Sequence, residues 1–291
     1  MRAIRLPRLH VITDTRAAVA PTAAEAASSG AAARRRDPLR VAAAALAAGA
    51  RLIQVRPEDH YTDRAAFDLA AAVAALCDAH GAVCLVNDRV HIAQAVGADG
   101  VHLGAEDLPL DAARRLLPAA IIGGTCRDPE SARAARRAGA DYLGVGPVWG
   151  TTTKAGLPQP IGLTGLAAVC AAVDLPVIAI GGITAERAAL CREAGAHGVA
   201  VVGAVAAAAD PAAATAELLA AVGETPDAAR AAGPASTDDA AHRRITTQTG
   251  GDAPRRGAVG PSAAEGAARH EEASASIASR PSDSLRGTGA G

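Results

Sequence analysis

The chain has 291 residues, enough for one large domain or two ordinary ones, and its formal net charge is −1. A charge this close to zero argues against binding to nucleic acid along a basic surface. No segment is apolar for long enough to span a bilayer, and residues 1–8 contain no apolar run of the signal-peptide kind. The five cysteines are scattered without a CxxC pair, which favours reduced thiols in the cytoplasm.

Short apolar runs rich in β-branched residues recur along the chain, each bounded by Gly, Asp, Asn or Pro. Runs of four or five such residues are typical of buried strands in a parallel sheet. Because the chain has only one Trp, one Phe and two Tyr, its core must be built from Ala, Val, Leu and Ile. The predicted strands are residues 9–13, 52–56, 83–87, 100–103, 121–125, 142–145, 177–180 and 198–202.

Helical patterns fill the gaps between these strands. Residues 63–81 repeat apolar side chains at a spacing near 3.6, between Asp63, the expected N-cap, and a closing Gly81. Residues 128–141 and 184–198 have the same start and stop signals. Glycines that precede four of the predicted strands mark further helix ends. They are Gly49, Gly97, Gly139 and Gly195.

Eight strand–helix units in about 220 residues predict a single α/β domain, a (β/α)8 TIM barrel, over residues 1–223. A doubly wound open sheet is the alternative. It normally has fewer strands and a glycine-rich first turn, and no GxGxxG follows the first strand here.

Two stretches differ from the rest of the chain. Residues 17–38 are of low complexity and are expected to form a flexible insertion in a loop. Residues 224–291 are rich in Ala, Gly, Ser and Pro and contain very few large aliphatic side chains. Such a composition buries too little apolar area to offset chain entropy, so a disordered tail is expected.

Unusual polar and glycine residues follow the predicted strands, at the end where TIM barrels place their active sites. Asp88 and Asp107 come after the third and fourth strands. Two carboxylates with room for water suit Mg²⁺ held against a phosphate. The alternative is that each aspartate caps the helix that follows it.

Glycine turns after the last two strands, residues 181–183 and 203–204, indicate a phosphate cradle of backbone N–H groups. Tight turns that need a positive φ are the alternative explanation. The loop after the sixth strand adds three threonine hydroxyls and Lys154, the only lysine of the chain. A lysine at a solvated loop tip is usually without function, but every other basic residue in this chain is arginine.

Arg56, after the second strand, is a further cation at the same end of the barrel. The alternative is that Arg56 has a structural role, in which its guanidinium pairs with Asp88 or Asp107. Two anion sites at one barrel mouth suggest a transfer between phosphorylated substrates, with diphosphate as the leaving group. No Ser/His/Asp or Cys/His arrangement supports covalent catalysis.

These motifs resemble the thiamine phosphate synthase family over residues 9–222, in the order VITD, QVR, VNDR, GVHLGAEDLP, DYLGVGPVWGTTTK, AIGGI and GVAVVGAV. The resemblance implies a transferase of thiamine biosynthesis. It would join 4-amino-2-methyl-5-(diphosphooxymethyl)pyrimidine to a thiazole phosphate and release diphosphate. It also implies Mg²⁺ as the cofactor and a dissociative transfer, in which the thiazole nitrogen attacks a pyrimidine-methyl cation.

The resemblance also implies roles for individual residues. Arg56 and Lys154 would be catalytic, and Asp88 and Asp107 would bind Mg²⁺. The pyrimidine diphosphate would be held by Gln54, Arg56, Asn87, Thr125 and Lys154. The thiazole phosphate would be held by Thr151, Thr152, Thr153, Gly182, Val202 and Gly203.

The chain departs from the family pattern at four positions. Glu58 replaces a usual Lys, Gly203 a usual Ser, Ala105 a usual Gln and Thr125 a usual Ser. An acid beside a diphosphate repels it, unless the carboxylate points outward or engages the metal.

Two other functions are alternatives. One is a thiazole tautomerase-like isomerase of the same fold, which typically lacks the counterparts of Asp107 and Pro147. The other is a non-catalytic phosphate-binding regulator, for which Glu58 and Gly203 are the only support. The expected partners are small phosphorylated molecules, with neither nucleic acid nor membrane. Both a monomer and a homo-oligomer stay open.

Overall fold

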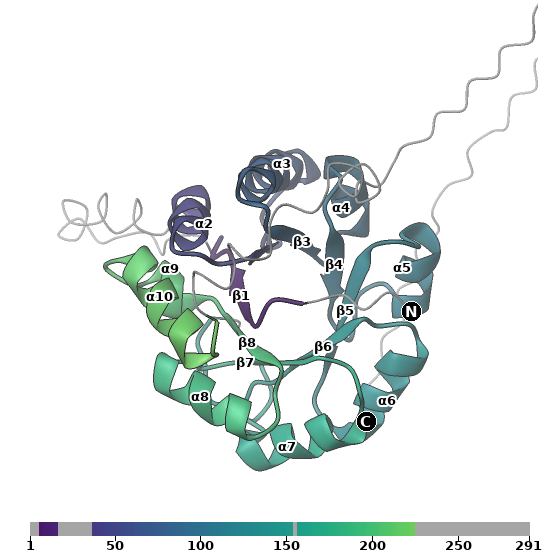
Figure 1. Ribbon diagram of the computed structural model, residues 1–291. Coiled ribbons are helices and arrows are strands. Elements are labelled where there is room, and N and C mark those ends of the chain that lie inside the picture. The colour runs from purple at the N-terminus through teal and green to yellow at the C-terminus, as the bar shows by residue number, and fades with distance from the viewer. Residues whose placement is uncertain (1–5, 17–36, 154–155, 225–291) are drawn as a thin grey trace, which may run out of the picture. The chain divides into compact units, whose positions relative to one another are not determined.

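A closed barrel of eight parallel strands forms the centre of the computed structural model, which describes residues 6–16, 37–153 and 156–224. Each strand pairs with the next in chain order and β8 returns to β1, so that Val11 lies opposite both Ile53 and Val201. Figure 1 looks along the barrel, with the strands inside a ring of helices. The strands are β1 (Leu9–Ile12), β2 (Leu52–Val55), β3 (Val83–Asn87), β4 (Gly100–Leu103), β5 (Ile121–Cys126), β6 (Tyr142–Val145), β7 (Val177–Ile180) and β8 (Gly198–Val201). The predicted TIM barrel and its eight strands are confirmed.

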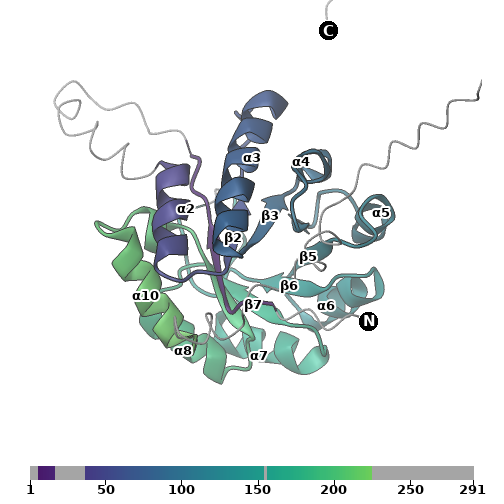
Figure 2. The ribbon, with the colours of Figure 1, turned by 45° about the horizontal axis from the view of Figure 1, so that its top comes forward.

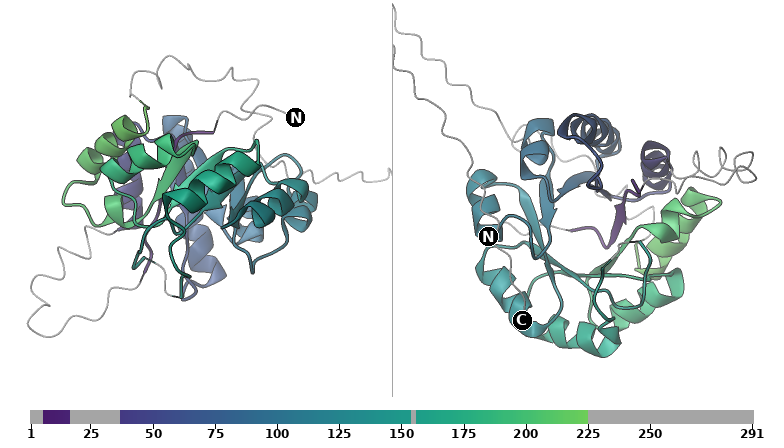
Figure 3. Two further views of the ribbon diagram at one scale, coloured as in Figure 1. Left: turned by 90° about the horizontal axis from the view of Figure 1, so that it is seen from below. Right: turned by 180° about the vertical axis from the view of Figure 1, so that it is seen from behind.

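Within the described ranges a helix follows each strand, and two follow β8. The helices lie outside the strands in the views of Figures 2 and 3. They are α2 (Pro38–Ala47), α3 (Asp63–His80), α4 (Val90–Val96), α5 (Leu110–Leu116), α6 (Pro129–Arg137), α7 (Gly162–Ala172), α8 (Ala185–Glu193), α9 (Gly203–Ala206) and α10 (Pro211–Ala221). None of these helices has the length and apolarity needed to cross a membrane.

The helix ends follow the predicted signals with one exception. Asp128 and Thr184 cap α6 and α8 as expected, and the glycines predicted to end helices have positive φ. The cap of α3, however, is Thr62 and not Asp63. The Thr62 hydroxyl accepts from the N–H of Ala65 at 3.2 Å, which leaves Asp63 in the first turn, where a carboxylate also opposes the positive end of the helix dipole.

The predicted insertion overlaps the start of α2. Asp37 is the N-cap of that helix, its carboxylate accepts from Leu39 N, and Pro38 is the first helical residue. Residues 17–36 and 225–291, which hold most of the predicted insertion and tail, lie outside the described residues. Glu224, assigned to the tail, accepts a hydrogen bond from the backbone N–H of Arg8 at 2.7 Å and so contacts the barrel.

The core has two parts because side chains alternate across each strand. Ile53 and Val55 of β2 point outward and pack with small helix residues such as Ala66 and Ala70. Alanines on these helix faces let the helices lie close to the sheet, which suits a chain with few aromatic residues. The opposite strand faces form a second cluster inside the barrel, together with Leu6 before β1 and Val202 after β8. Its strand residues are Ile12, Leu52, Leu85, Tyr142, Ile178 and Ala200.

His10 lies in this interior and should make the stability of the fold depend on pH. Burial, with a smaller contribution from nearby His102, lowers the pKa of His10 to about 3, and Nε2 hydrogen-bonds the Pro7 carbonyl at 3.2 Å. In the unfolded chain His10 binds a proton below about pH 6.5, whereas in the folded chain it stays neutral down to about pH 3. The stability of the fold therefore falls as pH falls through that window. We expect His10 to lower the free energy of unfolding by about 2 kcal/mol between pH 7 and pH 5.

Urea unfolding at both pH values measures this loss. His10→Gln should remove most of it, whereas His60→Gln, which replaces an exposed histidine, should retain the wild-type difference. An unchanged difference in His10→Gln would show that other groups carry the pH dependence.

Candidate active site

The loops after β1 and β2 are joined by hydrogen bonds at the carboxyl end of the barrel. The Thr13 hydroxyl accepts from Arg56 N at 2.9 Å, and the Thr15 hydroxyl donates to the Arg56 carbonyl at 2.7 Å. Thr15 also accepts from Glu58 N at 3.0 Å. The Arg56 guanidinium forms an ion pair with Glu58 at 3.2 Å. The structural alternative for Arg56 named Asp88 or Asp107 as its partner, whereas the ion pair found for this guanidinium is with Glu58.

Asp88 and Asp107 follow the adjacent strands β3 and β4 but do not cap the helices that follow. The N-cap positions of α4 and α5 are Arg89 and Pro109, and neither makes a side-chain cap bond. Asp88 has φ 62°, the one positive value at a described residue other than glycine. Such strain in a non-glycine residue persists where surrounding structure enforces it, and it concentrates at functional sites. The Asp107 carboxylate accepts from Gly104 N at 2.6 Å.

The donor set at these two strand ends fits Mg²⁺. Both side chains are carboxylates, the hard oxygen donors that this ion prefers, and Mg²⁺ usually takes one or two of them with water and substrate phosphate as its other ligands. No group of three or more His, Cys, Asp or Glu that could enclose a metal occurs among the described residues, so a dedicated all-protein cage is not formed there. Two carboxylates on neighbouring strands match the open type of site.

A polar network lies inside the barrel beneath this end. His102 of β4 hydrogen-bonds the Tyr142 hydroxyl through Nδ1 and the Thr125 hydroxyl through Nε2, both at 3.0 Å. Gln54, which is buried, hydrogen-bonds the same Tyr142 hydroxyl. Burial raises the pKa of Tyr142, so its hydroxyl stays protonated. The network joins Gln54 to Thr125, two predicted pyrimidine residues from separate strands. Another predicted pyrimidine residue, Asn87, ends β3 in register with His102.

The sequence analysis did not single out His102 and Tyr142, because their signal depends on which residues of neighbouring strands lie opposite each other. Alternation along β4 places Gly100, His102 and Gly104 on one face, and the same alternation places Gly123 and Gly144 inward on β5 and β6. A Cβ at Gly123 would lie 2.2 Å from Tyr142 Cζ, and one at Gly144 would lie 2.8 Å from His102 Cε1. Glycines opposite one histidine and one tyrosine therefore make room for both rings, a pattern that becomes visible only once the strand register is known.

The predicted phosphate residues lie on three loops that approach one another. Thr151 and Thr153 share a hydrogen bond between their hydroxyls at 3.0 Å, and a Cβ at Gly203 would be 3.4 Å from Thr153 Cγ2. Arg16 binds the Thr152 carbonyl at 3.1 Å while its guanidinium is held by the Asp14 carboxylate. Val202 is the N-cap of α9, which begins at Gly203.

Two further residues bear on the predicted site, Lys154 as a member of it and Cys126 as a neighbour. Lys154 lies outside the described residues, so its position in the site stays a prediction. Cys126 adjoins Thr125, but burial raises the pKa of its thiol to about 12, which keeps the thiol protonated and unreactive.

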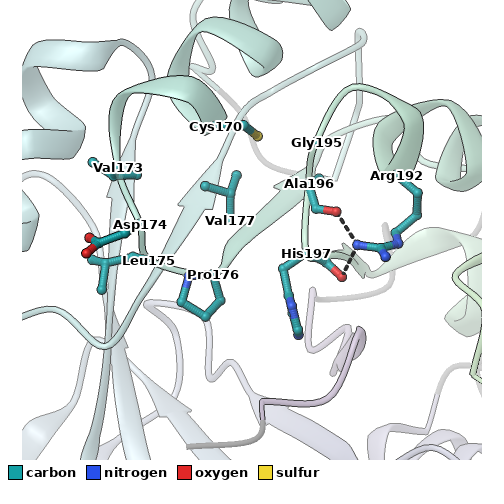
Figure 4. Close-up of a pocket in the computed structure, with 10 residues that line it drawn as sticks. All are labelled: Cys170, Val173, Asp174, Leu175, Pro176, Val177, Arg192, Gly195, Ala196 and His197. Atoms are coloured by element: carbon teal, nitrogen blue, oxygen red, sulfur yellow. Dashed lines mark hydrogen bonds between the residues drawn. The ribbon is translucent and has the colours of Figure 1, made fainter. Parts of the chain in front are cut away.

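A separate hollow of about 400 Å³ lies at the opposite end of the barrel. It is lined by residues of the turns that enter β7 and β8, including Pro176 and His197, and by residues near the ends of the preceding helices, including Arg192 of α8 (Figure 4). Those turns precede the strands, whereas the predicted site residues lie at the strand carboxyl ends. We therefore give this hollow no role in catalysis.

Comparison with known proteins identifies the family. Residues 26–205 match the family described as thiamine monophosphate synthase (TMP-TENI). The chain belongs to this family. A thiamine-phosphate synthase of Salinispora tropica is 52% identical over 217 residues, which are 74% of this chain and 96% of the relative. The thiamine-phosphate synthase of Salinispora arenicola is 53% identical over 214 residues, which are 72% and 95% of the two chains.

A solved structure of the same family supports the fold. Thiamine phosphate pyrophosphorylase from Pyrococcus furiosus is 35% identical and superposes with a TM-score of 0.63, over 74% of this chain and 95% of its own. The sequence-based resemblance to the thiamine phosphate synthase family is thereby confirmed. These relatives match this chain over nearly their whole length, whereas about a quarter of this chain lies outside each match.

Proposed function

We propose that this chain catalyses the thiamine-phosphate synthase reaction of thiamine biosynthesis. It joins 4-amino-2-methyl-5-(diphosphooxymethyl)pyrimidine to a thiazole phosphate and releases diphosphate. The observation that carries the proposal is the 52% identity to a synthase over 96% of its length. Carboxylates, a cation and the glycine turns predicted to bind phosphate at one end of the barrel support it. The substrates are small phosphorylated molecules.

The reaction breaks one bond and forms another at the same carbon. The C–O bond between the pyrimidine methylene and diphosphate breaks, and diphosphate leaves with the electron pair. The thiazole nitrogen then forms a C–N bond to the methylene carbon. Negative charge grows on the leaving group, so fixed cations lower the barrier and no side-chain nucleophile is needed. Arg56 and Lys154 are the catalytic residues in this proposal.

Asp88 and Asp107 would hold Mg²⁺ in this proposal. The bound ion would supply positive charge that offsets the charge of the departing diphosphate. The two carboxylates, which follow β3 and β4, would hold the ion near that end of the barrel.

The polar network would form the floor beneath the pyrimidine. His102 is held from one side by Tyr142, so its other ring nitrogen keeps the Thr125 hydroxyl in one orientation. Gln54 and Asn87 add amide groups that can donate and accept hydrogen bonds. Thr151 to Thr153, Gly182, Val202 and Gly203 would hold the thiazole phosphate on the other side of the mouth.

The five cysteines support a reducing compartment, and we place the enzyme in the cytoplasm. They carry no disulfide in the structure, and four of them are buried. A reducing cytosol is where such thiols persist.

Incubating the full chain with both phosphorylated substrates and Mg²⁺ tests the function. Thiamine phosphate and diphosphate should appear in equal amounts, and neither should appear when one substrate is omitted. Binding of the thiazole phosphate without product would favour the non-catalytic regulator. Isomerisation of a thiazole substrate in place of condensation would favour the tautomerase, although this chain retains Asp107 and Pro147.

Glu58→Lys should tighten binding of the pyrimidine diphosphate, lowering its KM about fivefold. The ion pair of Glu58 with Arg56 neutralises a cation that the diphosphate needs, and a lysine would both release Arg56 and add a charge. Asp59→Lys is the matched control, because it makes the same change of charge at an exposed neighbour in the same loop. A KM that rises in Glu58→Lys, or falls equally in both variants, would mean that Glu58 does not oppose the diphosphate.

A further inference from the structure

The loops after β6 and β7 continue to pair beyond the ends of those strands. Val148 N donates to the Ile180 carbonyl at 2.9 Å, and Trp149 N donates to the Gly181 carbonyl at 3.1 Å. Gly182 then packs directly against the first of these loops. A Cβ at Gly182 would lie 2.6 Å from the Gly150 carbonyl oxygen and 2.9 Å from Trp149 Cβ. The loop that carries Thr151 to Thr153 therefore touches the glycine turn of the predicted phosphate cradle.

Arg187 joins these two loops from a third element, helix α8. Its guanidinium lies over the Trp149 ring, 5.0 Å from the centroid, and its Nη1 donates to the Gly182 carbonyl at 2.6 Å. A planar guanidinium can stack on an aromatic ring and donate to a carbonyl at the same time, which an ammonium does less well. One side chain thus contacts both halves of the cradle.

The contact with Gly182 also orients the backbone. In a planar trans peptide the carbonyl and the following N–H point in opposite directions. Because the Gly182 carbonyl points to Arg187, the N–H of Ile183 is directed away from Arg187. Backbone N–H groups held in fixed directions before a helix are the usual means of binding phosphate in barrels.

We propose that Arg187 is a positioning residue for the phosphate of the thiazole substrate, acting through Trp149 and Gly182. This inference rests on the proposed function, which supplies the substrate. Arg187 keeps the threonine loop and the glycine turn at a fixed separation, so that their hydroxyl and N–H groups meet one phosphate. Its loss would let the two loops move apart without removing any group that touches the substrate.

Steady-state kinetics with each substrate varied in turn tests the proposal. Arg187→Gln should raise the KM for the thiazole phosphate about tenfold and change the KM for the pyrimidine diphosphate less than about twofold. Arg192→Gln is the matched control, because Arg192 is on the same helix and its guanidinium also donates to backbone carbonyls, those of Ala196 and His197, but at the opposite end of the barrel (Figure 4). It should leave both KM values unchanged. Equal KM values in wild type and Arg187→Gln would overturn the proposal.

A binding measurement separates this proposal from the proposed function. Trp149 is the only tryptophan of the chain, so its fluorescence reports on the contact with Arg187. Titration of the full chain with thiazole phosphate alone, and with inorganic phosphate alone, should give half-saturation about tenfold higher in Arg187→Gln than in wild type. If wild type makes no thiamine phosphate but this weakening is found, the function is wrong and the positioning role stands. If wild type is active and the titrations coincide, the positioning role is wrong.

A conservative variant covers the case in which Arg187→Gln does not fold. Arg187→Lys keeps the charge but lacks the planar fork, so its KM for the thiazole phosphate should lie between the other two. A KM equal to that of wild type in Arg187→Lys would show that charge alone suffices and would overturn positioning through the stacked contact.

Discussion

Asp107→Asn should lower kcat/KM by about 100-fold or more at a fixed Mg²⁺ concentration, with little change in thermal stability. The Asp107 carboxylate accepts the Gly104 N–H at 2.6 Å. An asparagine side-chain oxygen can accept the same hydrogen bond, so the loop after β4 keeps its conformation. What the variant removes is one of the two negative charges proposed to bind the metal, so the Mg²⁺ concentration for half-maximal activity should rise.

A matched control separates this effect from a general loss of charge. Asp111→Asn removes a carboxylate four residues downstream, which pairs with Arg115 on the exposed surface of α5, and should retain wild-type kinetics. Asp88→Asn should resemble Asp107→Asn, because asparagine also tolerates the left-handed backbone found at Asp88. Wild-type activity and an unchanged Mg²⁺ requirement in Asp107→Asn would remove this residue from the metal site.

The barrel could be predicted from sequence because its signals are local. A buried parallel strand is a short apolar run, and each run here is bounded by turn residues within a few positions, as at 83–87 and 100–103. The closing glycines of helices are local signals too. The wrongly predicted cap of α3 shows the limit of such local signals. Thr62 and Asp63 are both good capping residues, and only the backbone conformation decides which of them is the N-cap.

The candidate site could be predicted only in part, because its contacts join distant parts of the chain. Position after a strand suggested Asp88 and Asp107 as site residues. The ion pair of Arg56 with Glu58, only two residues away, depends on the conformation of the loop after β2, which the sequence pattern does not show. Arg16 and Thr152 are 136 residues apart in the chain, and closure of the barrel brings them together. The interior network depends on strand register in the same way.

Gly123→Ala is the substitution expected to lower stability the most, because it acts on that interior network. The added Cβ would lie 2.2 Å from Tyr142 Cζ and 2.5 Å from His102 Nδ1. Both distances are shorter than the contacts that Cβ atoms make in proteins. Neither ring can move freely, because each is packed inside the barrel and Tyr142 is 1% exposed. We expect the free energy of unfolding to fall by about 3 kcal/mol or more, from overpacking together with strain on the His102–Tyr142 hydrogen bond.

Denaturant unfolding of Gly123→Ala beside Gly150→Ala measures this effect. Gly150 lies in the loop after β6, and a Cβ there would meet nothing within 4 Å, so Gly150→Ala should unfold like wild type. Gly123→Ala should also lose activity, because displacing either ring releases the Thr125 hydroxyl that His102 holds at 3.0 Å. Equal stability of the two variants would mean that the rings do not meet at Gly123. The polar floor assigned to the pyrimidine would then have to be built from other side chains.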